Sequence, residues 1–262
     1  MPRVLAKPDT LNELNENFQQ HRLEQPVFLN SVPKCGTHLL RNIFRMFVPV
    51  DQQYHEQFIQ IPVLNQHLKA FDQAQPKLSW GHLLFSDTSA MALHHVKHIV
   101  VVRDPFDWVL ARARFFLSDN FQGNMENLKS GRVSVEEVLN MMIFGIYQKA
   151  PTLSEIFTHN ATAWLGTGIQ LVRYEDVIKH LKALDKPEAE IYFKELLSGL
   201  NLPEWPNDWR ERVETGSDRE QSGTYRDNLK NTAFEIPNEL PDIQKQLVEY
   251  AAPGLRRLLG YY

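Results

Sequence analysis

A lysine, a glycine and a threonine stand close together directly after an apolar run, in an arrangement that suits the binding of phosphate. The run is Val27–Ser31, followed by Pro33-Lys34-Cys35-Gly36-Thr37 and by a helical pattern from about Thr37 to Phe47. Glycine lets successive backbone N–H groups of such a turn face one concavity, and the next helix adds its positive N-terminus. The lysine adds a mobile positive charge. The segment therefore predicts a loop that binds phosphate.

This loop differs from the Walker A loop of ATP-binding proteins. The Walker A sequence, G-x-x-x-x-G-K-[ST], has two glycines and places its lysine after the second. Lys34 instead precedes Gly36, the only glycine of this loop. We therefore expect the bound anion to differ from the β- and γ-phosphates of ATP.

Two more polar clusters follow predicted strands. His98–Val102 is a continuous apolar run, typical of a parallel strand buried on both faces, and Arg103-Asp104-Pro105 ends it. Residues 169–173 form a similar run, and Tyr174-Glu175-Asp176 follows. Ligands of open α/β sheets bind outside the carboxyl ends of the strands. We therefore expect Lys34 and these two clusters to share one pocket.

The rest of the chain supplies the elements that position these clusters. Helices are predicted over 134–163, 186–199 and Ile243–Leu259, and a polar, loop-rich stretch over 203–232. Segment 50–95 is rich in Gln, His and Pro, which predicts short helices mixed with loops. Strands that alternate with helices predict an α/β fold, a single domain in which a P-loop-like parallel β-sheet has helices on both faces.

Composition narrows the class of protein. The chain has 262 residues, of which 23% are charged and 43% hydrophobic, so it can bury a sizeable core. Its net charge of −4 argues against general binding of nucleic acid or anionic membranes. Cys35 is the single cysteine, and no signal-peptide pattern or 18-residue apolar run is present. We therefore expect a cytoplasmic protein without a membrane span.

Two other groups of residues invite functional hypotheses. His94-His95-x-x-His98 has a spacing that suits metal ligands, but His98 begins a strand, and a solvated loop is the favoured interpretation. Phe115-Phe116, Met141–Phe144 and Tyr147 suit the wall of an apolar pocket. Ordinary helical core packing explains them equally well.

Four segments, in order, resemble the motifs of sulfotransferases that use 3′-phosphoadenosine 5′-phosphosulfate (PAPS). They are Pro33–Thr37, Trp80–Leu83, Val100–Asp107 and Val172–Asp176. The resemblance spans about residues 26–230 by order and spacing, and it is closest to divergent, bacterial-type cytosolic members. Twenty-one positions separate His82 from Arg103, close to the interval that the family keeps between its catalytic histidine and its 3′-phosphate arginine.

The resemblance implies a role for each matching residue. Lys34 would stabilise the leaving phosphate oxygen, and His82 would be the general base that deprotonates the acceptor hydroxyl. Arg103 would bind the 3′-phosphate, and Tyr174 would pack on the adenine. The 5′-phosphate would be held by the loop and the start of its helix, at Cys35, Gly36, Thr37 and His38. The scheme needs no metal, and it leaves 3′-phosphoadenosine 5′-phosphate as product.

Plainer readings of the same residues stay open. Arg103 also fits an ion-paired strand end, and His82 a structural histidine. Tyr174-Glu175-Asp176 also fits a strand exit with a helix cap. The thiol of Cys35 also fits a nucleophile at a helix N-terminus, although the family position is usually a serine that shapes the backbone.

Several positions depart from the family pattern. His38 replaces a threonine, and Leu39 replaces the tryptophan that stacks on the adenine. Ala111 replaces the serine that contacts the 3′-phosphate, so Arg112 or Arg114, one to three residues later, is the expected substitute. Of the two, Arg112 is the one that we expect to contact the cofactor.

The family's C-terminal cofactor loop is matched only loosely, by Gln221–Asn228. Within it we expect Ser222, Gly223 and Arg226 to contact the cofactor, with Arg219 or Arg226 supplying the missing positive charge. By the resemblance, residues 1–262 form one sulfotransferase-like domain. It has an N-terminal helix in 1–25, a cofactor-binding core in 26–180 and a helical and loop-containing part in 181–262.

Two other functions remain as alternatives. A P-loop type of nucleotide-dependent kinase or phosphotransferase would need Mg²⁺ and a Walker loop. A non-catalytic nucleotide-binding relative is favoured only by His38, Leu39 and Ala111. In the leading hypothesis the acceptor is a hydroxyl group of a small molecule or glycan, or less readily an amine, with no nucleic-acid partner. The identity of the acceptor and the oligomeric state stay open.

Overall fold

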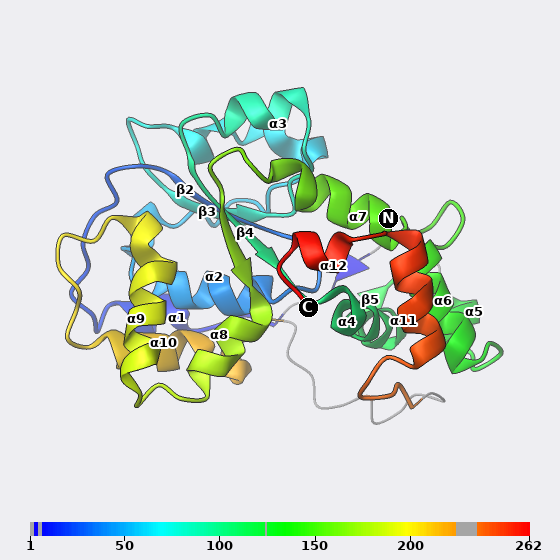
Figure 1. The fold of residues 1–262 in the computed structure, drawn as a ribbon. Coiled ribbons are helices and arrows are strands. Elements are labelled where there is room, and N and C mark those ends of the chain that lie inside the picture. The colour runs from blue at the N-terminus through cyan, green and yellow to red at the C-terminus, as the bar shows by residue number, and fades with distance from the viewer. Residues whose placement is uncertain (1–2, 5–6, 124, 224–234) are drawn as a thin grey trace.

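Four parallel strands form the central sheet of the protein. The computed structural model describes residues 3–4, 7–123, 125–223 and 235–262 (Figure 1). The strand order is β3 (Leu78–Gly81), β2 (Val27–Ser31), β4 (Lys97–Val102) and β6 (Gln170–Arg173). All three pairings are parallel. Parallel strands of this kind need apolar side chains on both faces because helices cover both.

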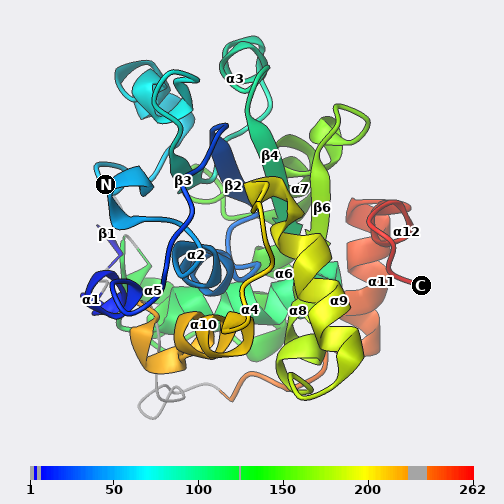
Figure 2. The same cartoon turned by 90° about the vertical axis from the view of Figure 1, so that its left-hand side faces the viewer.

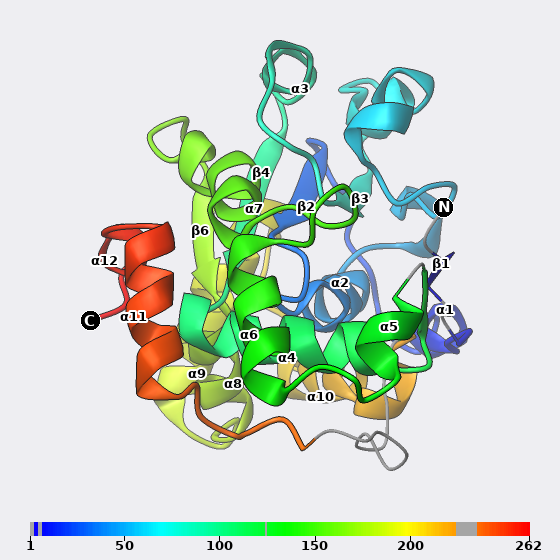
Figure 3. The ribbon, with the colours of Figure 1, turned by 90° about the vertical axis from the view of Figure 1, so that its right-hand side faces the viewer.

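Helices lie against both faces of this sheet, as Figures 2 and 3 show from opposite sides. One side carries α2 (Thr37–Arg45), α8 (Tyr174–Leu181), α9 (Pro187–Leu196) and α10 (Trp209–Ser217). The other side carries α4 (Pro105–Leu117), α6 (Val135–Phe144), α7 (Leu153–Asn160) and α11 (Asp242–Ala251). The expected α/β class, with a parallel sheet between two helical layers, is confirmed.

Shorter elements complete the described chain. The helices are α1 (Leu11–Asn15), α3 (Asp87–Ala92), α5 (Glu126–Lys129) and α12 (Leu255–Leu258). β1 (Arg3–Val4) pairs antiparallel with β5 (Phe121–Gln122). Single 3-10 turns cover Val50–Gln52, Ile61–Gln66, Leu68–Phe71, Thr162–Trp164, Leu197–Leu200 and Arg219–Gln221. Among the described residues, no helix is long and apolar enough to cross a membrane.

Two of the elements that the sequence did not predict, β3 and α10, each contain a glycine. The strand β3 lies inside segment 50–95 and ends at Gly81, where a Cβ would overlap the carbonyl of Ile59. The helix α10 lies inside the predicted loop 203–232 and contains Gly216. A Cβ at Gly216 would stand 2.6 Å from the Cα of Ile43, so the glycine lets α10 approach α2 closely. From the sequence, each glycine favours a turn. In the fold, each instead allows another segment of backbone to pack closely against it.

Predicted and observed helices also differ in extent. The region 1–25 contains a helix of only five residues, α1. The predicted helix 134–163 is two helices, α6 and α7. The predicted C-terminal helix is interrupted between α11 and α12, where Gly254 adopts a left-handed φ of 73° directly after Pro253. A proline followed by a left-handed glycine ends a helix, since neither continues its hydrogen bonding.

Candidate functional site

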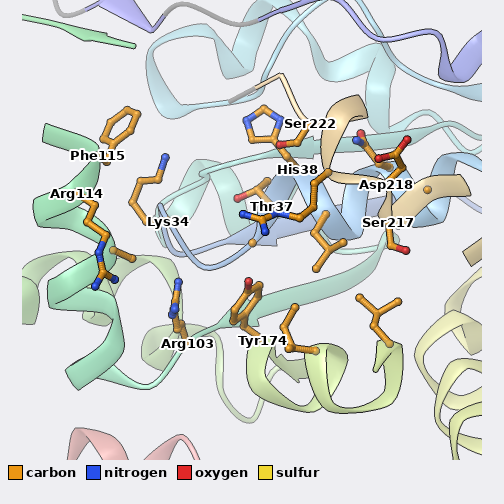
Figure 4. A pocket seen from close by; sticks show the side chains of 18 of the residues that line it. Lys34, Thr37, His38, Arg103, Arg114, Phe115, Tyr174, Ser217, Asp218 and Ser222 are labelled. Carbon is orange, nitrogen blue, oxygen red and sulfur yellow. The ribbon is translucent and has the colours of Figure 1, made fainter. Parts of the chain in front are cut away.

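A cavity of about 760 Å³ lies at the carboxyl edge of the sheet. The turns after β2, β3, β4 and β6 all open toward it, as parallel strands require. Figure 4 shows the side chains that line it, contributed by the β2–α2 loop, α4, α8 and the end of α10. It brings together eight of the expected site residues, namely Lys34, Gly36, Thr37, His38, His82, Arg103, Tyr174 and Ser222.

The β2–α2 loop has the concave backbone that its sequence predicts. Lys34 and Gly36 both adopt left-handed φ angles, of 72° and 93°. The loop is tied to α4, because the indole Nε1 of Trp108 donates a hydrogen bond of 2.6 Å to the carbonyl of Pro33. The ring of Tyr174 packs on Gly36 so closely that a Cβ there would overlap it. Alternating left-handed residues before a nine-residue helix form a nest of N–H groups for an anion.

Cys35 contributes only its backbone to this loop. Its side chain is fully buried and does not line the cavity. Burial raises the pKa of the thiol well above its usual value, against the opposing charge of Arg103. The side chain is therefore a neutral thiol in the core, which removes the nucleophile hypothesis.

The ammonium group of Lys34 lies against an aromatic ring. Its Nζ is 3.5 Å from the centroid of the Phe115 ring on α4. Figure 4 shows the two side chains next to each other at one end of the cavity. A cation over an aromatic face is stabilised by about 0.5–2 kcal/mol, depending on its desolvation. Phe115 therefore holds the lysine beside the β2–α2 loop.

His82 is fixed at the end of β3 by the neighbouring strand. The buried side chain of Asn30 accepts from the N–H of Leu83 and donates to its carbonyl, both at 2.9 Å. The Nδ1 of His82 is 2.8 Å from the carbonyl oxygen of Ser31, and its ring packs edge-to-face on Phe58. A carbonyl only accepts, so Nδ1 carries the hydrogen and Nε2 carries the lone pair.

The imidazole of His82 is neutral at physiological pH. Burial is the main cause that lowers its pKa to about 4; the charge of Lys34 acts in the same direction, and the carbonyl of Ser31 opposes both. A neutral ring with its lone pair on Nε2 has the protonation form that a general base requires.

Arg103 extends from the end of β4 over Tyr174. Its guanidinium carbon is 4.7 Å from the centroid of the Tyr174 ring, and its Nε is 4.0 Å from Oε1 of Glu175. The same Nε is buried and has no hydrogen-bond partner among the described residues. The Tyr174 ring holds the guanidinium in place, and its Nε–H remains available as a donor. This arrangement suits a ligand rich in hydrogen-bond acceptors, such as a phosphate.

Two residues near the C-terminus fix the turn that carries Arg103. We call Arg256 and Tyr261 the C-terminal clasp. Both oxygens of Asp104 accept from Arg256, at 3.0 and 2.8 Å. Oε2 of Glu175 accepts from the hydroxyl of Tyr261 at 2.7 Å, while Oε1 accepts from the N–H of Asp104 at 3.1 Å. The clasp therefore joins the ends of β4 and β6.

A solved structure shares this architecture. No family model and no curated protein matches the chain. The crystal structure of mouse sulfotransferase SULT7A1 complexed with PAP matches it with a TM-score of 0.52 and 17% sequence identity. The match covers 96% of this chain and 83% of that chain. The protein has a sulfotransferase-like fold. The likeness extends over nearly the whole chain and agrees with the single-domain architecture expected from the sequence.

Within this sulfotransferase-like fold, the expected contact by Arg112 is wrong. Arg112 is 3% exposed and donates to the carbonyls of Met142 and Pro151, both at 2.7 Å. It therefore faces the layer of α6 and α7. Ala111 and Arg114, three positions apart on α4, share the face that lines the cavity. Burial lowers the pKa of Arg114, and the charge of Arg103 adds to the effect, so the two guanidinium groups interact.

The end of α10 and the turn after it form the opposite wall of the cavity. Ser217, Asp218, Arg219 and Ser222 line it. Gly223 is buried, and its carbonyl accepts from the N–H of Lys7 at 2.9 Å, so it supports the wall from behind. Arg226, expected as a cofactor contact, lies outside the described residues.

Several lining residues were not identified from the sequence. They are Asn42, Phe58, Ile178, Leu181, Lys182, Ser217 and Asp218. The helical period would have given Ile178, Leu181 and Lys182 once Tyr174 was placed, because they follow it by one and two turns of α8. Phe58 reaches the cavity from the irregular segment before β3, and no local pattern marks it.

The two other groups of residues have no place in this cavity apart from Phe115. Phe116 and Met142 are buried core residues, whereas Phe144 and Tyr147 are exposed. Among the described residues, no group of three or more His, Cys, Asp or Glu could hold a metal ion.

Proposed function

We propose that this protein is a sulfotransferase that transfers a sulfuryl group from PAPS to a hydroxyl acceptor. One observation carries the proposal. A single cavity contains an anion-binding loop with a lysine, a separate pair of arginines, and a neutral histidine. Two anion subsites suit a nucleotide with phosphates at two positions, and the histidine suits proton removal from an acceptor. The sulfotransferase-like fold, shared with a structure that contains PAP, supports this reading.

The two subsites divide the nucleotide between them. The N–H groups of the β2–α2 loop and the hydroxyl of Thr37 would bind the 5′-phosphate, which the positive end of α2 also attracts. Arg103 and Arg114 would bind the 3′-phosphate, with Ala111 leaving room between them. The charge of Arg103 helps to lower the pKa of Arg114, and two neighbouring guanidinium groups gain most from a doubly charged anion.

The chemical step follows from the positions of His82 and Lys34. The acceptor oxygen attacks the sulfur as its proton passes to Nε2 of His82. The bond between sulfur and the bridging oxygen breaks, and its electron pair stays on the 5′-phosphate, where Lys34 neutralises the growing charge. General base catalysis contributes roughly 10²–10⁴-fold, and one positioned charge donor about 10²–10³-fold.

Aromatic side chains flank both of these residues. Phe58 packs on His82 with ring centroids 4.7 Å apart, and Phe115 packs on Lys34. Both rings line the cavity. They support an acceptor whose hydroxyl group is attached to an apolar face.

Ligand-dependent thermal stability tests the nucleotide. Adenosine 3′,5′-bisphosphate is expected to stabilise the protein, whereas AMP at the same concentration stabilises it less. At one hundred times its Kd, the ligand adds about 2.7 kcal/mol, or roughly 5–10 °C for a chain of this size. Stabilisation by ATP with Mg²⁺ alone would instead support the phosphotransferase alternative.

Transfer from PAPS to a panel of alcohols and phenols then tests catalysis. We expect His82→Ala to retain the bisphosphate affinity and to lose transfer. Bisphosphate binding without transfer to any acceptor, in wild type and variant alike, would support the non-catalytic alternative.

A further inference from the structure

A buried serine connects the two halves of the proposed site. Ser31 is the last residue of β2 and is fully buried. Its Oγ is 2.6 Å from Oγ1 of Thr37 in the phosphate loop and 3.1 Å from Nδ1 of His82. The side chain itself does not line the cavity, whereas both of its partners do. Ser31 therefore touches the expected base and the expected phosphate ligand from behind.

The hydrogens of this chain of contacts can be counted. Nδ1 of His82 must carry a hydrogen because it also faces the carbonyl of Ser31 at 2.8 Å. Oγ of Ser31 then accepts from Nδ1, and its own hydrogen is free for Thr37. Phosphate oxygens at neutral pH mainly accept hydrogen bonds, so Thr37 must donate to them. Its oxygen can then only accept, and the donor at 2.6 Å is Ser31.

Only one direction of donation satisfies all of these groups when phosphate is present. It runs from His82 Nδ1–H to Ser31, from the Ser31 hydroxyl to Thr37, and from the Thr37 hydroxyl to phosphate. The opposite direction would turn the hydroxyl of Ser31 toward Nδ1 and require a lone pair there. That lone pair would face the carbonyl of Ser31, which is repulsive.

We infer that Ser31 is a positioning residue that couples nucleotide binding to the protonation form of His82. The inference rests on the proposed function. A phosphate on Thr37 fixes the direction of the hydroxyl of Ser31, which holds the hydrogen of His82 on Nδ1 and the lone pair on Nε2. The carbonyl of Ser31 already favours this form without ligand, and binding of the sulfuryl donor thereby adds a second hydrogen bond that reinforces it.

Three variants separate this role from plain core packing. Ser31→Ala removes the hydroxyl, Ser31→Thr retains it, and Thr37→Val removes the next hydroxyl along. Ser79→Ala is the matched control, because Ser79 is equally buried on the adjacent strand β3. Within the described part of the chain, its hydroxyl donates one hydrogen bond, to the carbonyl of Val27 at 3.4 Å. Each protein is tested with adenosine 3′,5′-bisphosphate as the probe.

Two measurements are made on each protein at pH 7. Calorimetry gives the Kd of the bisphosphate, and NMR of ¹⁵N-labelled imidazoles follows the Nδ1–H of His82 with and without saturating bisphosphate. In wild type and Ser31→Thr we expect the bisphosphate to shift the Nδ1–H resonance and slow its exchange with water. In Ser31→Ala the Kd should rise by roughly fivefold, the size of one hydrogen bond, and the shift should fall to less than half.

The Thr37→Val variant tests the coupling from the other end of the chain. It should also abolish most of the Nδ1–H shift, and adding Ser31→Ala to it should weaken binding no further. An unchanged Kd and shift in Ser31→Ala, or full additivity in the double variant, would overturn the inference alone. Failure of wild type to bind the bisphosphate would overturn the proposed function and the inference with it.

Discussion

Two arginines of α4, two residues apart, show how helical rotation separates a side chain that lines the cavity from one that is buried in the core. Arg112 satisfies the carbonyls of Met142 and Pro151, whereas Arg114 lines the cavity beside Ala111. The sequence offers both side chains for the same task. The 100° rotation between successive residues of a helix decides between them, because Arg114 shares a face with Ala111 and Arg112 does not.

Replacing each arginine by glutamine separates the two roles. Arg114→Gln is expected to weaken adenosine 3′,5′-bisphosphate by roughly tenfold or more, and AMP little, since one charge-assisted hydrogen bond contributes about 1.5–3 kcal/mol. Arg112→Gln is expected to lower the melting temperature, because it leaves buried carbonyls unsatisfied. Calorimetry and thermal unfolding give both quantities. Equal losses of bisphosphate and AMP affinity in Arg114→Gln would contradict the assignment.

The sequence predicted those cavity-lining side chains that directly follow a strand with a clear apolar pattern. Lys34, Gly36 and Arg103 were predicted because apolar runs mark the ends of β2 and β4. Phe58 and Asp218 reach the cavity through tertiary packing, and nothing in their local sequence indicates it. Ser31 lies within a predicted strand, yet its contacts depend on the parallel register of β2 with β3, which the local sequence does not define.

At the scale of elements, the ends of β4 and β6 are held together by side chains rather than by backbone pairing alone. Glu175 accepts from both the Asp104 N–H and the Tyr261 hydroxyl, and it lies 4.0 Å from Arg103. The proposed 3′-phosphate contact therefore depends on the C-terminal clasp.

Loss of the Tyr261 hydroxyl should loosen the Arg103 turn. We expect Tyr261→Phe to reduce the preference for adenosine 3′,5′-bisphosphate over AMP by about three- to tenfold. This is less than the full effect of one hydrogen bond to a charged group, about 1.5–3 kcal/mol, because Tyr261 acts on Arg103 only through Glu175. Tyr250→Phe on α11 is the control, because Tyr250 is 79% exposed. The ratio of the two Kd values is the measurement. A preserved ratio with a lowered melting temperature would show that the clasp serves stability alone.

Strands with long apolar runs were predicted closely. Elements that depend on tight packing against other parts of the backbone were not. β2 has the predicted bounds, and β4 begins one residue early. β3 has only four residues, Leu78–Gly81, too few for a clear pattern. The polar composition of α10 and its Gly216 favour a loop locally, and packing on α2 overrides that preference.

At the scale of the whole molecule, three histidines, of which His98 is buried and His38 and His82 are half-buried, make the fold sensitive to acid. Burial lowers the pKa of His38 to about 3, of His82 to about 4 and of His98 to about 3. Below about pH 6.5 these histidines bind protons in the unfolded chain, whereas in the folded protein they stay neutral until the pH reaches their lowered pKa values. Stability is therefore complete above about pH 6.5 and falls as the pH drops toward 3.

Removing one of these histidines should make the free energy of unfolding depend less steeply on pH under acidic conditions. His98 packs on Trp164, and its Nε2 has no hydrogen-bond partner among the described residues. In urea unfolding at pH 7, 6 and 5, His98→Leu should reduce the slope of the unfolding free energy by up to about 1.4 kcal/mol per pH unit. His94→Leu, at an exposed position, should follow wild type. Parallel curves for His98→Leu and wild type would refute this origin of the acid loss.

The clasp also bears on how the protein is made. Arg256 and Tyr261 are translated long after the phosphate loop, His82 and Arg103. A nascent chain therefore carries every residue of the proposed chemistry before it carries the side chains that fix the Arg103 turn. If the proposed function holds, fragments that end before Arg256 would bind nucleotide weakly and gain little protection from proteases by binding it. Retention of the ligand would thus distinguish finished molecules from unfinished ones.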